Sequence, residues 1–254
     1  FRTGQEEIVD NILLGRDVCG IMPTGAGKSI CYQLPALLLP GITIVVSPLI
    51  SLMIDQVKAL NEAGVHAAYI NSALTENQIT KALYNAMCGR YKIVYVAPER
   101  LETNRFLEFV LNADISMITI DEAHCISQWG QDFRPSYLKI VNLIKMLPKR
   151  PVVSAFTATA TQAVKDDIVC VLGLNNPFIK VTGFDRSNLY FEVRQPNNKD
   201  AEVLNYVLSH RDDSGIIYCA TRKNVDKVYA MLAKNGIAVT RYHAGLDNDM
   251  RKAN

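Results

Sequence analysis

Short runs of apolar, often β-branched residues recur along the chain, and longer segments with helical periodicity separate them. The apolar runs cover residues 17–22, 42–46, 67–70, 93–96, 117–120 and 152–156. The helical segments cover residues 30–39, 49–63, 75–87, 137–146 and 161–171. Near-continuous apolar strands that alternate with helices are typical of a parallel sheet buried between helical layers. The sequence therefore predicts an α/β fold with a mostly parallel sheet and helices on both faces.

The composition excludes several other classes of protein. The chain has 254 residues, of which 49% are hydrophobic and 20% are charged. These values do not fit disordered, collagenous or disulfide-scaffold chains, and the length allows about one or two domains. The net charge is only +2, so nucleic-acid binding would need a locally basic groove. No apolar run approaches the ~18 residues of a membrane span, and the first residues do not resemble a signal peptide.

Six cysteines are spread irregularly along the chain, at positions 19, 31, 88, 125, 170 and 219. None belongs to a Cys-x-x-Cys pair, which argues against a zinc ribbon and against a secreted disulfide framework. Free thiols in a reducing compartment are therefore expected. The histidines at positions 66, 210 and 243 also lack metal-ligand spacing.

A change of pattern near residue 184 predicts a first domain over residues 1–184 and a second over residues 185–254. Polar, turn-rich sequence follows residue 183, and strand-like runs then occur at 189–193, 216–218 and 238–242. Helical segments at 201–208 and 224–235 separate these runs. Three strands are too few to complete an α/β core, and the second domain is therefore expected to be partial. The chain has no starting Met, and we expect a fragment cut at both ends.

Other short patterns predict ordinary structural roles. Thr3 followed by Glu6 predicts a capping box for a first helix, and Gly15 predicts where that helix ends. A set of basic residues is expected to form a solvated helix face, namely Lys139, Lys145, Lys149 and Arg150.

The apolar run at residues 17–22 leads into a glycine-containing segment that precedes a helix. This segment comprises Pro23, Thr24, Gly25, Ala26, Gly27, Lys28 and Ser29. Such a strand, turn and helix indicate a phosphate-binding loop, whose backbone N–H groups and helix N-terminus face phosphate oxygens. Lys28 would then reach the β- and γ-phosphates, and the Ser29 hydroxyl would ligate Mg²⁺. Met22 stands where the usual pattern has glycine, so an ordinary glycine-rich turn is the alternative.

Two acidic residues, Asp121 and Glu122, directly follow the apolar run at residues 117–120. Carboxylates at the carboxyl end of a buried parallel strand face the crevice in which ligands bind. Asp121 is suited to hold Mg²⁺, and Glu122 is suited to orient or deprotonate an attacking water. A solvated pair of acids at a strand end is the alternative.

A third block, with Thr157 and Thr159, follows the run at residues 152–156. These hydroxyls could link the nucleotide site to the second domain, with His124 forming a hydrogen bond to this block. A threonine-rich turn that only caps the next helix is the alternative.

Taken together, these blocks resemble those of superfamily-2 helicases, and further stretches resemble RecQ-family DNA helicases. The superfamily blocks are Phe1-Arg2-x-Gly4-Gln5, residues 23–29, Asp121-Glu122-Ala123-His124 and Thr157-Ala158-Thr159. Residues 125–137 resemble the aromatic-rich loop of the RecQ family. Residues 48–53, 97–101 and 242–246 match additional RecQ blocks, so the resemblance covers essentially the whole chain.

The resemblance implies an ATP- and Mg²⁺-binding RecA-like domain, followed by the first part of a second RecA-like domain. It implies an ATP-dependent helicase that moves 3′ to 5′ on single-stranded DNA and unwinds duplex DNA in recombination and repair. Arg2 and Gln5 match residues that contact adenine in that family, and the departure at Ala26 is expected to be tolerated. The family's arginine finger belongs to later motifs, and its zinc-binding and winged-helix domains are not found in this sequence. The chain alone is therefore expected to bind ATP but turn it over poorly.

Aromatic residues at four-residue spacing, Trp129, Phe133 and Tyr137, follow the acidic pair. A buried helical stripe is the alternative, but glycine, aspartate and proline residues between them favour a loop. Exposed aromatics on a loop offer bases a surface for stacking, worth about 1–3 kcal/mol per base. Arg134 could pair with a phosphate or stack on a base.

Further residues lie where strands end or in blocks that resemble DNA-contacting motifs. These candidates are Pro48, Arg100, Arg222 and His243. Backbone N–H groups and helix dipoles at such positions can hold phosphates of a single strand. An ordinary helix start is the alternative for each of them.

Three interpretations of the whole protein follow. The first is a RecQ-type DNA helicase, located in the nucleoid-associated cytoplasm of a bacterium or in a eukaryotic nucleus. The second is an RNA helicase of the DEAD/DEAH type, against which the aromatic loop argues. The third is a nucleotide-dependent DNA-binding module without unwinding activity.

Overall fold

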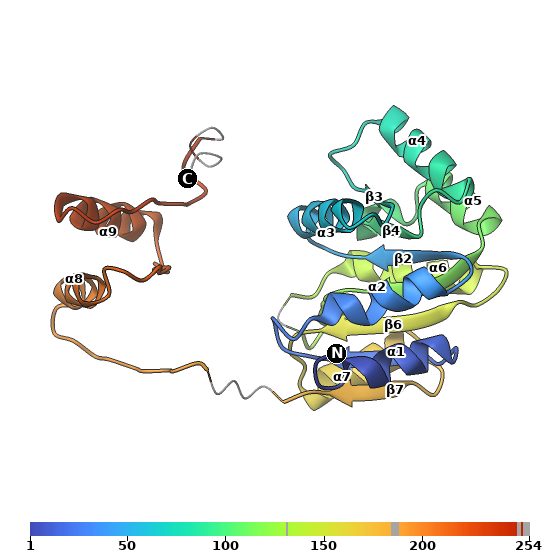
Figure 1. Ribbon diagram of the computed structural model, residues 1–254, viewed down its shortest axis with the longest axis horizontal. Helices are drawn as coiled ribbons and strands as arrows, with labels where there is room; N and C mark the ends of the chain where they lie inside the picture. Colours follow the sequence, from blue (N-terminus) through green and yellow to red (C-terminus); the bar gives the residue numbers. More distant parts are fainter. Residues whose placement is uncertain (131, 184–187, 248–249, 251–254) are drawn as a thin grey trace. The chain divides into compact units, whose positions relative to one another are not determined.

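A computed structural model describes residues 1–130, 132–183, 188–247 and 250 (Figure 1). The chain divides into two compact units, Phe1–Asp185 and Arg186–Asn254, each of which is described here by itself. The domain boundary expected at residue 184 lies outside the described residues, as do the final residues 251–254.

The first unit contains a seven-stranded sheet in which every pair of neighbouring strands is parallel. Its strands are β1 (Val18–Ile21), β2 (Ile42–Val46), β3 (Ala67–Ile70), β4 (Ile93–Val96), β5 (Ile115–Ile120), β6 (Val152–Thr157) and β7 (Phe178–Val181). Their order across the sheet is β3-β4-β2-β5-β6-β1-β7. The predicted parallel α/β fold is confirmed.

In the described residues of the first unit, one α-helix precedes β1 and six lie between successive strands. They are α1 (Gln5–Leu13), α2 (Lys28–Leu38), α3 (Ile50–Glu62), α4 (Glu76–Met87), α5 (Asn104–Asn112), α6 (Leu138–Met146) and α7 (Gln162–Val171). Three short 3₁₀ turns, η1 (Pro98–Arg100), η2 (Ala123–Ile126) and η3 (Pro135–Tyr137), follow strands β4 and β5. In the part of the chain that the structure covers, no helix has the length and apolar character needed to cross a bilayer.

The sheet separates two apolar cores, so helices cover both of its faces (Figure 1). Helices α1, α2 and α3 pack on one face, and α4, α5, α6 and α7 pack on the other. Strand β2 shows why all of its residues except Thr43 are apolar: Ile44 and Val46 enter one core, and Val45 enters the other. Alternate side chains of a strand point to opposite faces, and here both faces are buried.

Helix starts follow local sequence signals in some places and not in others. Thr75 caps α4 in a complete capping box with Gln78, and the Thr161 hydroxyl accepts a hydrogen bond at the start of α7. The capping box predicted at Thr3 is wrong, because Gly4 caps α1 in a left-handed conformation with φ 81° and no side-chain cap. Gly15 follows the end of α1 with φ 78°, as predicted.

Arg150 is exposed, as predicted, but it lies beyond the end of α6 and not on a helix face, and it also has a structural role. Its guanidinium forms two hydrogen bonds with the Asp17 carboxylate, at 2.6 and 3.1 Å, and Asp17 is only 2% exposed. The Asp17 carboxylate also accepts the backbone N–H groups of Val153 and Asn175, at 2.9 and 2.7 Å. Asp17 precedes β1 and Arg150 precedes β6, so this ion pair joins the two segments that lead into neighbouring parallel strands, at the edge where the strands begin.

Two helices, α8 (Lys199–Ser209) and α9 (Arg222–Lys234), lie entirely within the described residues of the second unit. The strands predicted at 189–193, 216–218 and 238–242 do not form, and these residues have no regular secondary structure. Ile216 and Tyr218 are 80% and 91% exposed, although their β propensity is high. A strand needs a hydrogen-bonded neighbour, and none pairs with these runs among the residues described.

Candidate functional site

The glycine loop lies between β1 and α2, at the carboxyl end of the strand. Gly25 and Gly27 have φ 83° and 79°, in the left-handed region that favours glycine. Gly27 caps α2, so Lys28 and Ser29 lie in its first turn, where backbone N–H groups lack a carbonyl partner within the helix. This arrangement suits a bound anion.

The two departures from the usual loop pattern have structural explanations. The Met22 side chain is fully buried in the core beneath α1, α2 and α3, and its N–H donates to the Thr157 carbonyl at 3.0 Å. Ala26 is partly buried and packs against the same core. Both side chains therefore stabilise the loop.

Arg2 and Gln5, the predicted adenine contacts, lie against the glycine loop. The Gln5 amide is buried and donates to the carbonyls of Ala26 and Gly27, both at 3.1 Å. The Arg2 guanidinium donates to the carbonyl of Gly25, and the Arg2 N–H donates to the Gln5 side chain at 2.7 Å. Contact with a base stays a prediction, and the structure adds that these residues hold the loop in shape.

Asp121 follows β5, the strand that pairs with β2 and β6. Its carboxylate is 7% exposed and accepts hydrogen bonds from the Ser47 hydroxyl at 3.4 Å and from the Glu122 N–H at 3.0 Å. Burial and, after it, the Glu122 charge raise the pKa of Asp121 to about 6, against the opposing effects of the Glu122 N–H hydrogen bond and the Lys28 charge. The carboxylate therefore sits in a buried place with little compensating positive charge.

Glu122 adopts φ 48° and ψ 48°, a left-handed conformation that is unusual for a residue with a side chain. Its carboxylate lies 3.3 Å from the Nδ1 atom of His124. The hydrogen bond from His124 lowers the pKa of Glu122, and the Lys28 charge lowers it further, while burial opposes them. Glu122 is therefore an ionised acceptor beside the buried Asp121, at a strained position typical of functional sites.

The third block joins this acidic end of the sheet. Nδ1 of His124 lies 2.9 Å from the Thr157 hydroxyl, which itself donates to the Thr159 carbonyl at 3.1 Å. A hydroxyl has one proton, so Thr157 accepts from His124 and Nδ1 carries the hydrogen. The hydrogen bond with the Cys125 sulfur, and then the Glu122 carboxylate, raise the pKa of His124. His124 thus connects Glu122 with the Thr157 block.

The aromatic loop only partly matches the predicted exposure. Trp129 is 76% exposed and Phe133 is half-buried, whereas Tyr137 is completely buried. The Tyr137 hydroxyl donates to the Asp121 carbonyl at 3.0 Å. Its predicted exposure on the loop is therefore wrong: it fixes the backbone of the acidic motif. Gln131 of this loop lies outside the described residues.

Arg134 connects the aromatic loop to a neighbouring strand end. Its guanidinium pairs with the Asp132 carboxylate at 2.7 Å and donates to the Pro48 carbonyl at 3.3 Å. The structure therefore brings together Arg134 and Pro48, two of the candidate DNA contacts. Arg100 lies after β4 and pairs with Glu76 at 3.8 Å.

The remaining candidates belong to the second unit. Arg222 is exposed in the first turn of α9, directly after the Thr221 cap. Nε2 of His243 lies 3.2 Å from the Asp226 carboxylate, and its Nδ1 accepts the Gly245 N–H at 3.1 Å. This contact gives His243 a structural role within its unit.

A pair of buried tyrosine hydroxyls, contacted by a glutamine amide, lies where the sequence predicted no polar contact. The hydroxyl of Tyr32, on α2, lies 3.4 Å from that of Tyr95 on β4, which accepts from the Gln33 amide at 3.0 Å. Burial raises the pKa of Tyr32 well above its ordinary value. No short motif marks these residues, because aromatics in an apolar helix or strand usually predict core packing alone.

The sequence matches the family described as "DEAD/DEAH box helicase" over residues 2–167. It is 49% identical over 253 residues to "ATP-dependent DNA helicase RecQ" of Bacillus subtilis, covering 99% of this chain and 43% of that protein. It is 41% identical over 264 residues to "ATP-dependent helicase wrn-1" of Caenorhabditis elegans, covering 99% of this chain and 24% of that protein. The chain thus spans less than half the length of these relatives.

Two solved structures share the fold. A crystal structure of the DUF1998 helicase MrfA bound to DNA has a TM-score of 0.75 and 17% identity, covering all of this chain and 40% of that one. The Mycobacterium smegmatis helicase Lhr, bound to single-stranded DNA and AMP-PNP, has a TM-score of 0.68 and 16% identity, covering 98% of this chain and 37% of that one. At such identities the likeness concerns the fold alone.

Proposed function

The chain belongs to the DEAD/DEAH box helicase family, and from that premise we propose that it is the motor core of an ATP-dependent DNA helicase of RecQ type. The observation that carries the proposal is that Lys28, from the glycine loop, whose ammonium donates to the Met22 carbonyl at 3.2 Å, lies near enough to Asp121 and Glu122 for its charge to act on both carboxyls. The Lys28 charge lowers the pKa of both carboxyls, after the larger effects of burial on Asp121 and of His124 on Glu122. A triphosphate needs this combination of an anion-binding loop and an acidic edge.

Each candidate residue at the nucleotide site has a proposed role. The loop from Thr24 to Gly27 and the first turn of α2 would surround the phosphates through backbone N–H groups. Lys28 would pair with their charge, and Arg2 and Gln5 would orient the base. Glu122 would orient or deprotonate the attacking water; its lowered pKa keeps the carboxylate ionised, so that it can accept a hydrogen bond from that water.

The family uses nucleotide with a divalent metal, and we propose Mg²⁺ as that metal. Asp121 fits the ion, because its buried carboxylate lies beside a second carboxyl with little compensating charge. Asp121 and the Ser29 hydroxyl would hold it. Bound Mg²⁺ supplies positive charge that stabilises the transferring phosphoryl group.

The aromatic loop and nearby strand ends are the proposed contacts with single-stranded DNA. Exposed Trp129 would stack on a base, with Phe133 at its side. In the first unit, Arg134 and Arg100 would hold DNA phosphates, and Pro48 would lie at this contact because its carbonyl accepts a hydrogen bond from Arg134. In the second unit, Arg222 and His243 would contact the DNA. His124, Thr157 and Thr159 would couple the loop to the nucleotide, because His124 contacts both Glu122 and Thr157.

At the level of the whole protein, we propose 3′-to-5′ translocation on single-stranded DNA and unwinding of duplex DNA in recombination and repair. Residues 1–184 would form the first RecA-like domain and residues 185–254 part of a second. The 254 residues alone would bind ATP and hydrolyse it slowly, because the described part of the second unit contains no sheet. The protein would act where the DNA is, in the nucleoid-associated cytoplasm or the nucleus.

Nucleotide binding tests the loop. Titration of fluorescent ATP with Mg²⁺ should show tight binding by the wild-type chain and loss of most affinity in Lys28→Ala. Lys58→Ala is the matched control, because Lys58 is exposed on α3 and only pairs with Glu62 on the same helix. Equal affinity in all three proteins would refute the proposed phosphate site.

DNA binding tests the aromatic loop. Trp129→Ala should weaken binding of single-stranded DNA by about 1–3 kcal/mol, the worth of one stacked base, and leave ATP binding intact. Tyr84→Ala is the control, because Tyr84 is a 65% exposed aromatic on α4. Stronger stimulation of hydrolysis by single-stranded RNA than by DNA would instead favour an RNA helicase.

A further inference from the structure

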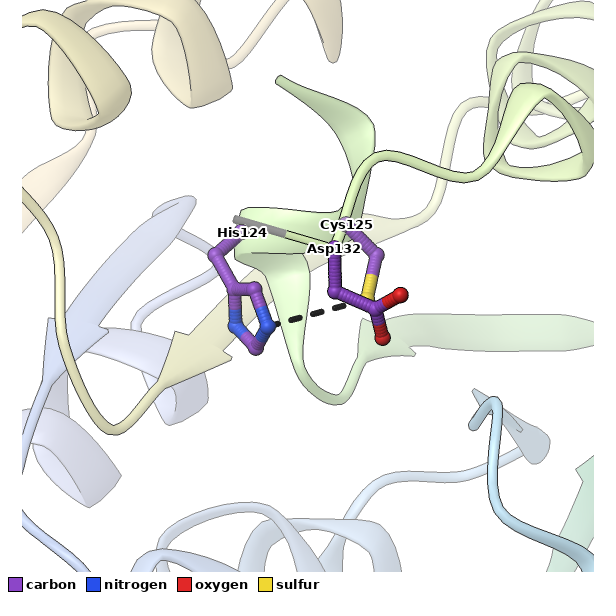
Figure 2. Close-up of side chains that lie close together, drawn as sticks. All are labelled: His124, Cys125 and Asp132. Carbon is purple, nitrogen blue, oxygen red and sulfur yellow. Dashed lines mark hydrogen bonds between the residues drawn. The ribbon is translucent and has the colours of Figure 1, made fainter. Parts of the chain in front are cut away.

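Three side chains of different chemistry converge beside the acidic motif. They are His124 and Cys125, in η2, and Asp132, on the aromatic loop (Figure 2). The Cys125 sulfur lies 3.8 Å from Nε2 of His124 and 3.8 Å from Oδ2 of Asp132. All three ligand atoms lie within 4.8 Å of one another. This arrangement is invisible in the cysteine and histidine spacing of the sequence.

These separations suit a tetrahedral metal ion. In a zinc site, bonds of about 2.3 Å to sulfur and 2.0–2.1 Å to nitrogen place the two ligand atoms about 3.6 Å apart. The two separations from the Cys125 sulfur, both 3.8 Å, are close to that value, so small side-chain shifts would let one ion contact all three atoms. A thiolate, an imidazole and a carboxylate together favour zinc-like ions over Mg²⁺, which prefers oxygen ligands.

The surrounding contacts orient the ligands as in known metal centres. Nδ1 of His124 faces the Thr157 hydroxyl at 2.9 Å and the Glu122 carboxylate at 3.3 Å, so Nε2 faces the sulfur. Metal-bound histidines typically donate their other N–H to a carboxylate or similar acceptor. The Asp132 carboxylate is likewise oriented by the Arg134 guanidinium at 2.7 Å.

The backbone holds the two halves of this cluster together. The Arg134 N–H donates to the Cys125 carbonyl at 2.8 Å, which returns the aromatic loop to η2. Gly130 makes the tight return possible, because a Cβ atom there would lie 2.6 Å from the His124 carbonyl oxygen. The cluster therefore exists in the folded chain before any ion binds.

We propose that His124, Cys125 and Asp132 form a binding site for a thiophilic divalent ion of the zinc class, and that its occupation inhibits hydrolysis. The Cys125 thiol would lose its proton to solvent on binding, and water would complete the coordination. The ion would tie Asp132 to the acidic motif and restrain Trp129, which lies between the ligands in sequence. The inhibitory half rests on the proposed function, because it requires Glu122 and the loop to act in hydrolysis.

Binding is tested without nucleotide, by adding Co²⁺ to the metal-free chain. The expected result is a sulfur-to-cobalt absorption band that saturates at one ion per chain and that Zn²⁺ abolishes. The fluorescence of Trp129, the only tryptophan, should change over the same range. Cys125→Ser should lose the band, and Asp132→Asn should weaken binding at least about 10-fold. Cys88→Ser, an exposed cysteine outside the cluster, should bind as the wild type does.

Several outcomes would overturn the site. They are absence of the band, its persistence in Cys125→Ser, or unchanged affinity in Asp132→Asn. The last variant decides the matter if Cys125→Ser fails to fold, because the Asp132 side chain is 54% exposed.

Hydrolysis is tested separately. With excess Mg²⁺ and ATP, stoichiometric Zn²⁺ should slow phosphate release by the wild type and by Cys88→Ser, but not by Asp132→Asn. Zinc binding without any slowing would overturn the inhibitory half. A metal-free chain that binds Co²⁺ as expected but never binds or hydrolyses ATP would count against the proposed function alone.

Discussion

Two buried carboxylates lie at opposite edges of the same sheet, Asp17 at the edge where the parallel strands begin and Asp121 at the edge where they end. Their surroundings differ. Asp17, before β1, is 2% exposed and has a two-pronged arginine partner and two backbone N–H donors. Asp121, after β5, is 7% exposed, and a second carboxyl lies beside it. Its closest side-chain donor, Ser47, is 3.4 Å away. The first carboxylate is satisfied by the fold, whereas the second lacks positive charge that a ligand could supply.

The largest expected effect concerns hydrolysis at the Asp121 edge. Asp121→Asn should reduce phosphate release by about 10²–10³-fold, a typical loss when one stabilising group is removed from an active site. The unfolding free energy should stay equal or rise, because the neutral amide ends the repulsion with Glu122. Urea denaturation and a phosphate-release assay measure the two quantities. A large loss of stability would contradict the difference drawn between the two edges.

The next effect concerns stability at the Asp17 edge. Arg150→Ala should lower the unfolding free energy by about 2–3 kcal/mol, because it leaves a buried carboxylate without its ion partner. This loss of unfolding free energy is smaller than for a fully buried ion pair. The Arg150 side chain is 38% exposed, and the Asp17 carboxylate keeps two backbone N–H donors in the variant. Urea denaturation measures it, with Lys149→Ala as the control for removing an exposed neighbouring charge. Equal stability of the two variants would show that the ion pair contributes nothing.

The smallest effect compares two buried threonines of the sheet. Thr157→Val removes the hydroxyl that accepts from His124, and should cost about 1 kcal/mol of stability. Thr43→Val should be neutral or stabilising, because the Thr43 hydroxyl is buried without a hydrogen-bond partner among the described residues. Thr157 is the last residue of β6 and Thr43 is the second residue of β2. The two variants therefore again compare the edge where the strands end with the edge where they begin. Thermal unfolding of both variants checks the sign of each change, and equal losses would break the comparison.

Much of the first unit could be predicted from its sequence. The strands expected at 42–46, 67–70 and 93–96 are β2, β3 and β4, because a strand buried on both faces forms a nearly continuous apolar run. The edge strand β7 escaped prediction: its residues are alternately half-buried and exposed, and it is recognisable only through its pairing with β1. The false strand at 216–218 shows the converse, since β propensity without a partner produced no strand.

The candidate site was predictable only as separate pieces. Lys28, Asp121 and Glu122 stand out because a glycine loop and a strand-end acid pair are local patterns. The hydrogen bonds from Gln5 to the glycine loop and from Tyr137 to the Asp121 carbonyl were not predictable. Such bonds depend on how the folded chain places side chains next to backbone groups that are distant in the sequence.

The sequence by itself determined the order of strands β1 to β6, their burial and the chemical types at their carboxyl ends, because these follow from patterns within a few residues. The tertiary structure alone decided which charges meet. Asp17 and Arg150 are far apart in the chain, and only the parallel pairing of β1 with β6 brings them together. It likewise decided that His124, Cys125 and Asp132 converge, because hydrogen bonds and metal ligation depend on distances that folding sets.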